Sequence, residues 1–132
     1  MVINADEAMP EGGIVTLRAE NMTLGARDSL PLEAGRYVKL SIQDQGIGIP
    51  EEYLHRIFDP YFSTKQKGSG LGLATAYSII INHDGYITVE SELGIGTTFH
   101  IYLPVSEKEL PEKLEAEEAL FVGRGRILVM DD

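Results

Sequence analysis

Two glycine clusters, joined by an aromatic segment, constrain the fold of this chain more than any other feature. The first cluster is Asp44-Gln45-Gly46-Ile47-Gly48-Ile49, the connecting segment is Phe58-Asp59-Pro60-Tyr61-Phe62, and the second cluster is Gly68-Ser69-Gly70-Leu71-Gly72-Leu73-Ala74. Glycine permits tight turns and lets the backbone approach a ligand closely. Each motif is common alone. Their order and spacing together predict a glycine turn and a glycine-opened helix on two sides of one pocket.

The alternation of apolar and polar residues predicts four strands. Residues 14–21 alternate, with Val15, Leu17 and Ala19 on one face, which indicates a half-buried strand. The same pattern recurs over residues 36–43, where Val38, Leu40 and Ile42 are expected to face inward. Two further strands, joined by a hairpin turn at 93–96, are predicted at 86–91 and 97–103.

Helical spacing and helix-ending residues predict three helices. They span residues 2–9, 51–57 and 70–83, and Gly85 is placed to cap the last one. The order of helices and strands indicates an α+β fold. We expect a two-layer α/β sandwich in which helices cover one face of a mixed, mostly antiparallel sheet.

Composition places the 132-residue chain among soluble globular proteins, because 43% of it is hydrophobic and 24% is charged. Its net charge of −10 argues against nucleic acid or an anionic membrane surface as a partner. The chain has no cysteine, which excludes disulfides and a thiolate zinc site and fits a reducing compartment. We find no membrane-spanning stretch or signal peptide, so a cytoplasmic location is expected, with any membrane anchor in a longer parent protein.

The two ends of the sequence are expected to belong to structures that continue beyond this chain. Residues 1–104 form the predicted domain, residues 105–125 an acidic linker, and residues 126–132 the first strand of another domain. The first helix begins abruptly at Met1, which suggests that an N-terminal part of this domain is missing. An orphan strand and an exposed sheet edge recruit partners. We therefore expect self-association or a disordered tail.

Asp44 is the candidate for recognising a nucleobase. Successive side chains of a strand point to opposite faces, and residue 44 is even-numbered like the inward-facing Val38, Leu40 and Ile42 of the preceding strand. Its carboxylate is therefore expected to point toward the core. Such a buried carboxylate needs a partner, and the exocyclic amine of adenine is a suitable donor. Gly46 and Gly48 would let the backbone turn beside a flat ring. The competing interpretation is a surface aspartate in a glycine turn.

The second glycine cluster is the candidate for binding phosphate. Free N–H groups and partial positive charge at a helix N-terminus suit a triphosphate, and Gly70 and Gly72 leave the approach open. Lys65 and Lys67 precede the loop and are within reach of phosphate oxygens. The alternatives are a merely flexible loop and solvated lysines.

Further candidates are weaker when taken as single residues. The amide oxygen of Asn4 suits Mg²⁺, although a surface asparagine on a helix is the simpler interpretation. The hydroxyl of Thr97 is expected to point inward and to bond adenine directly or through a water, unless it is only a satisfied sheet residue. His55, His83 and His100 lack metal-ligand spacing and an adjacent nucleophile, so we interpret them as structural or exposed.

These motifs resemble the catalytic and ATP-binding domain of sensor histidine kinases, in the wider group that includes the gyrase B subunit and MutL proteins. The resemblance covers roughly residues 1–104. It consists of an asparagine box at 4–13, a first glycine box at 44–48, a phenylalanine box at 58–65, a second glycine box at 68–73 and a terminal hairpin at 91–104. The short segment between Phe62 and Gly68 is similar to that of nitrogen-regulation kinases. The tail resembles the first strand of a receiver domain, with Asp131 and Asp132 at its acidic positions, which implies a hybrid kinase.

The resemblance implies ATP and Mg²⁺ as ligands, with Asn4 on the metal and Asp44 on the adenine amine. It implies a nucleotide-binding set of Asp44, Gly46, Gly48, Phe58, Lys65, Gly68, Gly70, Leu71, Gly72, Leu73 and Thr97. Glu7 stands where many members carry a phosphate-binding lysine, which puts that contact in doubt. The implied partners are a dimerisation domain bearing the phosphorylated histidine and a receiver domain.

The leading hypothesis is therefore the ATP-binding domain of a two-component histidine kinase, which donates the γ-phosphoryl group to a histidine on a separate domain. No catalytic residue is expected within this chain, and the chain alone should not phosphorylate itself. The second hypothesis is a nucleotide-binding or ATPase clamp of the same superfamily without kinase activity. A sandwich that binds no ligand is the third.

Overall fold

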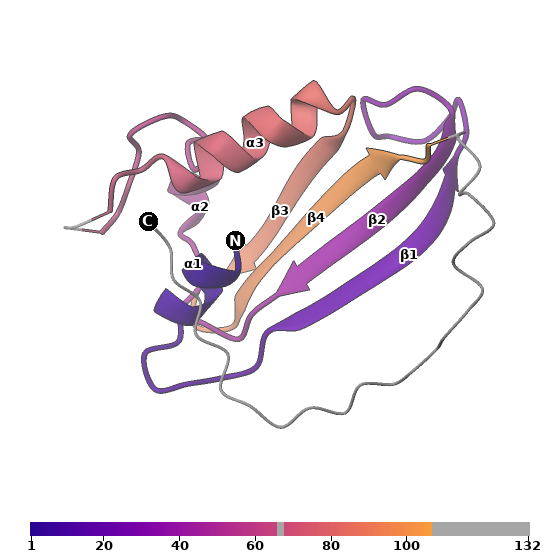
Figure 1. Ribbon diagram of the computed structural model, residues 1–132. Coiled ribbons are helices and arrows are strands. Elements are labelled where there is room, and N and C mark those ends of the chain that lie inside the picture. The colour runs from indigo at the N-terminus through magenta and orange to yellow at the C-terminus, as the bar shows by residue number, and fades with distance from the viewer. Residues whose placement is uncertain (66–67, 107–132) are drawn as a thin grey trace, which may run out of the picture.

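The computed structural model describes residues 1–65 and 68–106 (Figure 1). The predicted tail strand and all but the first two residues of the predicted linker lie outside these residues. The helices are α1 (Val2–Glu7), α2 (Glu51–Leu54) and α3 (Gly72–Asn82), and the strands are β1 (Thr16–Leu24), β2 (Gly35–Gln43), β3 (Tyr86–Glu92) and β4 (Gly96–Pro104). Every predicted element in this part of the chain is present, although all three helices are shorter than the predicted ranges 2–9, 51–57 and 70–83.

The described strands form one antiparallel sheet in the order β1-β2-β4-β3. The hairpin of β3 and β4 therefore pairs with β2 through β4, and β1 forms an edge. Figure 1 shows α3 crossing one face of the sheet, while α1 lies near the end where β2 stops. This arrangement confirms the α+β sandwich. Within the described part, no helix is both long and apolar enough to cross a bilayer.

The main hydrophobic core lies between the helices and the sheet. Its buried members are Ile57, Ile80, Ile87, Phe99 and Ile101. Leu40 and Ile42 of β2 pack against this cluster, as their alternation predicts. Because residue 44 shares their parity, the chain leaves β2 with the Asp44 side chain on the helix-covered side.

A second, smaller core lies on the opposite face of the sheet. Leu24, Tyr37 and Tyr102 are buried there, and Leu30 and Leu32 from the long β1–β2 connection cover them. The phenol of Tyr37 donates a hydrogen bond to the Glu33 carbonyl at 2.9 Å. This cluster was not predicted, because the covering loop has no periodic pattern.

The predicted inner face of β1 is not buried. Leu17 is 64% exposed and Ala19 is exposed as well, although both pair with core positions of β2. β1 is an edge strand, and the buried sheet residues of the main core belong to β3 and β4. Alternation therefore predicted the strand correctly, whereas the burial of its apolar face depends on which strands the helices cover.

Candidate functional site

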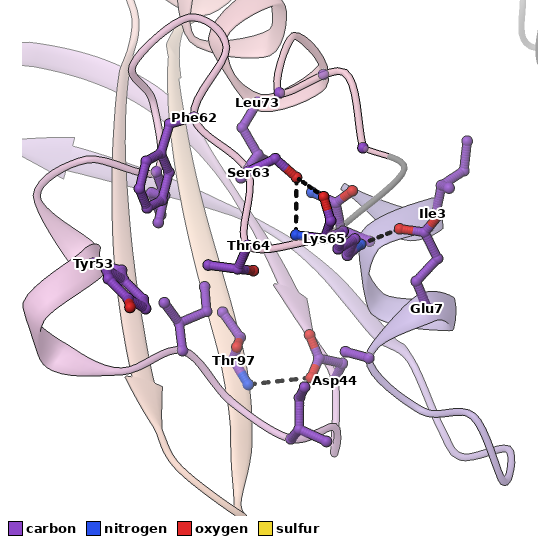
Figure 2. A pocket seen from close by; sticks show the side chains of 18 of the residues that line it. Ile3, Glu7, Asp44, Tyr53, Phe62, Ser63, Thr64, Lys65, Leu73 and Thr97 are labelled. Atoms are coloured by element: carbon purple, nitrogen blue, oxygen red, sulfur yellow. Dashed lines mark hydrogen bonds and ion pairs between the residues drawn. The ribbon is translucent and has the colours of Figure 1, made fainter.

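A cavity of about 490 Å³ opens at the end of the sheet where β2 stops. Its walls come from α1, the turn after β2, the α2 segment, the loop before α3 and the start of β4, so distant parts of the sequence meet there (Figure 2). This volume lies within the range of small-molecule pockets. Of the predicted site residues, the cavity is lined by Asn4, Asp44, Gly48, Lys65, Gly68, Gly70, Gly72, Leu73 and Thr97.

Asp44 lies at the bottom of this pocket and is 7% exposed. Its Oδ1 accepts hydrogen bonds from the backbone N–H of Gly46 at 2.9 Å and of Thr97 at 3.2 Å. The Asp44 N–H donates in turn to the Thr97 carbonyl at 2.9 Å. These bonds hold the carboxylate rigidly, as Figure 2 shows for the Thr97 contact.

The second oxygen of Asp44, Oδ2, has no hydrogen-bond partner within the described residues. Every fully buried side-chain nitrogen or oxygen in that part of the chain does have a partner. Oδ2 must therefore be accessible rather than sealed in the protein. A fixed, accessible carboxylate oxygen at the bottom of a cavity is an acceptor for a ligand N–H group.

Gly46 and Gly48 position this carboxylate by close packing. A Cβ on Gly46 would lie 2.6 Å from the Ala8 Cβ and 2.9 Å from Asp44 Oδ1. The turn is tied to the end of α1 by the Ile47 N–H, which donates to the Ala8 carbonyl at 3.1 Å. Gly48 has φ +74° and would overlap the Glu92 carbonyl if it carried a side chain. Gly46 itself does not line the cavity. Its effect on the site is indirect, through its contacts with Asp44 and Ala8.

The second glycine cluster forms the opposite wall. Gly68, Gly70 and Gly72 lead into α3, whose first turn has no side-chain cap. The N–H groups of that turn lack partners within the helix and remain available to an anion. Leu71 does not line the cavity and is 40% exposed, whereas its neighbour Leu73 does line it.

Phe58 was expected in the nucleotide-binding set, but it is not part of the apolar wall of the cavity. This ring packs inside the main core, 5.3 Å from the Tyr77 ring centroid and 6.4 Å from that of Phe99, and does not line the cavity. The cavity is lined instead by Ile49, Tyr53, Ile57, Phe62 and Phe99. Tyr53 and Ile57 are four residues apart, so helical spacing in the 51–57 segment was the signal that could have identified them.

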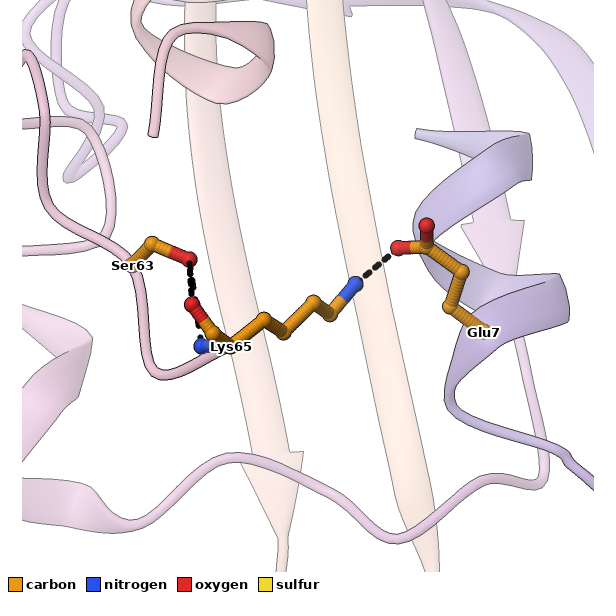
Figure 3. Close-up of polar contacts among 3 residues, drawn as sticks. All are labelled: Glu7, Ser63 and Lys65. Atoms are coloured by element: carbon orange, nitrogen blue, oxygen red, sulfur yellow. Dashed lines mark hydrogen bonds and ion pairs between the residues drawn. The ribbon is translucent and has the colours of Figure 1, made fainter. Parts of the chain in front are cut away.

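Lys65 and Glu7 meet across the mouth of the cavity. The Lys65 ammonium contacts the Glu7 carboxylate and so joins the loop before α3 to α1 (Figure 3). Ser63 holds the same loop, because its Oγ accepts from the Lys65 N–H at 3.1 Å. Lys65 is thus placed beside the cavity but is already paired. Lys67 lies outside the described residues.

Asn4 lines the cavity from α1, one turn before Glu7 and Ala8. The described residues contain no group of three or more histidine, aspartate or glutamate side chains able to hold a metal alone. Any cation bound here would therefore take most of its ligands from the ligand and from water.

None of the three histidines lines this pocket. His55 and His83 are exposed, in agreement with the prediction that these residues are structural or exposed. One detail was not predicted: His100 Nδ1 lies 2.8 Å from the Ser41 hydroxyl on the opposite face of the sheet. Neither residue lines the cavity at the end of β2. We interpret it as a cross-strand hydrogen bond between β4 and β2.

The sequence matches the family described as histidine kinase-, DNA gyrase B-, and HSP90-like ATPase over residues 1–107. This chain belongs to that family. It is 43% identical over 124 residues to sensor kinase CckA of Brucella abortus, covering 90% of this chain and 13% of that protein. It is also 43% identical over 106 residues to sporulation kinase E of Bacillus subtilis, covering 79% of this chain and 13% of that protein.

Solved structures of family members have the same fold. The mycobacterial sensor histidine kinase MprB superposes with a TM-score of 0.62 at 33% identity, covering 78% of this chain and 64% of that one. The catalytic domain of histidine kinase ThkA gives 0.61 at 35% identity, covering 78% and 60%. The fold and sequence are thus those of the ATP-binding catalytic domain of sensor histidine kinases. The chain spans only 13% of the length of the two kinases CckA and sporulation kinase E.

Proposed function

We propose that this domain binds ATP with Mg²⁺ and presents the γ-phosphate to a histidine on a separate dimerisation domain. The observation that carries the proposal is the accessible Oδ2 of Asp44 at the bottom of an apolar cavity. Such a carboxylate accepts from the exocyclic amine of adenine. It would repel the carbonyl oxygen that guanine has at the same ring position.

The rest of the cavity suits the remainder of the nucleotide. Ile49, Tyr53 and Phe62 offer an apolar surface to the adenine ring. The uncapped start of α3 and the Lys65 ammonium lie on the side where a triphosphate would extend. These local groups are needed, because a chain with a net charge of −10 does not attract an anion as a whole.

Asn4 is the proposed protein ligand of the metal. Mg²⁺ usually takes one or two protein oxygens and completes its shell with phosphate oxygens and waters. The single amide oxygen of Asn4 beside the cavity fits that preference. When bound, the metal would neutralise charge on the phosphates.

The proposed transfer requires positioning more than covalent chemistry by this domain. The bond between the γ-phosphorus and the bridging oxygen breaks, a P–N bond forms to the acceptor histidine, and ADP leaves. The similarity to proteins named as histidine kinases, MprB and ThkA, supports a histidine acceptor, and a response-regulator receiver is the proposed next partner. A nucleotide-binding clamp without kinase activity is the alternative.

We also propose that the parent protein is a hybrid kinase located in the cytoplasm or facing it. The match to sensor kinase CckA covers 90% of this chain, so it extends beyond the 107 residues of the family match. The acidic ending Asp131-Asp132 is the further support from the sequence.

Calorimetric titration with ATP and Mg²⁺ tests the binding step. We expect Asp44→Asn, which keeps the shape and one carbonyl oxygen, to weaken ATP binding by about 1–3 kcal/mol, the value of a hydrogen bond to a charged group. Asp28→Asn, in the exposed β1–β2 connection, is the matched control and should leave affinity unchanged. Equal affinities for Asp44→Asn and the unmodified domain would refute the assignment of Asp44.

Labelled ATP tests the transfer step. The domain is mixed with the dimerisation domain of one of its kinase relatives, and phosphohistidine is measured after alkaline quenching. Formation of phosphohistidine that Asp44→Asn reduces at limiting ATP supports the kinase proposal. Tight ATP binding without any phosphohistidine favours the clamp.

A further inference from the structure

We propose that Ser91 is a positioning residue for nucleobase selection, because it fixes the direction in which the Thr97 hydroxyl points its proton. The inference rests on the proposed binding of an adenine nucleotide and extends it to a residue that does not line the cavity. In this arrangement the two polar side chains at the bottom of the pocket, Asp44 and Thr97, offer only hydrogen-bond acceptors. A 6-amino purine is thereby preferred over a 6-oxo purine.

The Ser91 hydroxyl, at the end of β3, has three polar neighbours. The Ile49 N–H donates to its Oγ at 2.7 Å. Its Oγ lies 3.0 Å from the Gly96 carbonyl oxygen and 2.8 Å from the Thr97 hydroxyl oxygen. A serine hydroxyl has one proton to donate and two lone pairs that accept.

Only one arrangement of protons satisfies all three contacts. The Gly96 carbonyl can only accept, so the Ser91 proton is directed to it. One Ser91 lone pair is used by the Ile49 N–H. The remaining lone pair faces Thr97, and the Thr97 hydroxyl must therefore donate its proton to Ser91.

This arrangement determines what Thr97 presents to a ligand. Thr97 is 5% exposed and lines the cavity. With its proton committed to Ser91, its Oγ1 has only lone pairs left for the pocket. The accessible Oδ2 of Asp44 is also an acceptor. The amino group of adenine brings two protons to such a surface, whereas hypoxanthine brings a carbonyl oxygen at that position.

Without Ser91, the Thr97 hydroxyl is free to rotate and to donate into the pocket. A 6-oxo purine then finds a donor for its carbonyl oxygen, and discrimination falls. Ser91 also ties the pocket-lining Ile49 to the β3–β4 hairpin, so its loss has a structural effect too. That structural effect weakens both nucleotides alike, and the ratio of their affinities separates the two roles.

The test is titration with ATP and with inosine triphosphate, which carries a carbonyl in place of the adenine amine. We expect the unmodified domain to prefer ATP. Ser91→Ala should lower the ATP-to-ITP affinity ratio by about 5–10-fold, the factor that one hydrogen bond is worth. Ser91→Thr keeps the hydroxyl, so its ATP-to-ITP affinity ratio should equal that of the unmodified domain. Ser41→Ala, on the opposite face of the sheet, should leave it unchanged.

A double-mutant cycle tests whether Ser91 acts through Thr97. In a Thr97→Val background there is no hydroxyl to orient, so adding Ser91→Ala should not change the ratio further. Ser91→Cys, a weaker donor and acceptor of similar size, replaces Ser91→Ala if that variant does not fold. A ratio that stays constant while both affinities fall would overturn the inference. Absence of ATP binding by the unmodified domain would instead refute the proposed function.

Discussion

At the scale of single residues, Asp84 ends α3 in a conformation that favours glycine. Its φ is +55°, its N–H donates to the Ile81 carbonyl at 3.0 Å, and the Gly85 N–H donates to the Ile80 carbonyl at 2.9 Å. This is the Schellman pattern, with Asp84 rather than Gly85 in the left-handed position. Gly85 is required for a different reason, because a Cβ there would lie 2.5 Å from the Tyr102 carbonyl oxygen.

We therefore expect Asp84→Gly to stabilise the domain. Relief of left-handed strain is worth about 1–2 kcal/mol, partly offset by about 0.4–1 kcal/mol from the freer unfolded chain. A net gain of about 0.5–1 kcal/mol in the free energy of unfolding should be measurable in urea. Ser78→Gly, within α3 and exposed, is the control and should lose roughly 0.5 kcal/mol. A loss for Asp84→Gly as large as that of the control would contradict the assignment.

Two glycines of the second cluster differ in what they require. Gly70 has φ +68° and its Cβ would overlap the backbone of Tyr61, whereas a Cβ on Gly72 would meet no atom within 4 Å. We expect Gly70→Ala to destabilise the fold by more than about 1 kcal/mol. Gly72→Ala should leave thermal stability unchanged or slightly raised, yet weaken ATP binding, because its side chain enters the cavity. Parallel thermal unfolding and titration measure both, and equal losses of stability would show that the distinction is wrong.

At the scale of elements, the outer face of the sheet carries a titratable cluster. His100 of β4 bonds Ser41 of β2 at 2.8 Å. Burial and then the nearby Lys39 lower the pKa of His100 below its ordinary value of 6.5, while Glu90 and Glu20 raise it less. The fold thus favours the neutral imidazole. In the unfolded chain the same histidine takes up a proton near its ordinary pKa.

The sign of the pH effect follows from this difference. As the pH falls through 6.5, the unfolded state binds more protons than the folded state, so stability decreases until the lowered folded pKa is passed. The stability that the neutral His100 contributes is fully present above pH 6.5, the ordinary pKa of the unfolded chain. Urea unfolding at pH 7.5 and 5.5 should show a smaller decrease for His100→Gln than for the unmodified domain. His55→Gln, on the α2 side, should behave like the unmodified domain, and an identical decrease in all three proteins would refute the prediction.

The strands and helices were predictable because each carries a local pattern. Alternation located the four strands, and the parity of Asp44 correctly placed its carboxylate on the buried side. Burial that depends on neighbouring elements was not predictable. Leu17 alternates like a core residue but is exposed on the edge strand, and Phe58 belongs to the core while Phe62 lines the cavity. The motif that contains both aromatic residues does not say which of them faces the ligand.

At the scale of the whole molecule, the contact between Lys65 and Glu7 links segments 58 residues apart across the mouth of the cavity. Their side chains are 46% and 49% exposed, so the pair contributes little to stability, about 0–1 kcal/mol. Its greater effect should be on the nucleotide. The phosphates and the Glu7 carboxylate compete for one ammonium, and the carboxylate also repels the phosphates.

We therefore expect Glu7→Gln to bind ATP with Mg²⁺ about 2–5-fold more tightly, a gain in the range of an exposed ion pair, with little change in unfolding free energy. Lys65→Gln should bind more weakly, and both effects should shrink as salt is raised. Glu11→Gln makes the same change of charge just beyond α1, on a residue that does not line the cavity. If Glu7→Gln and Glu11→Gln change the affinity equally, then net charge rather than competition for Lys65 governs binding. In that case the Lys65–Glu7 contact has no part in admitting the nucleotide.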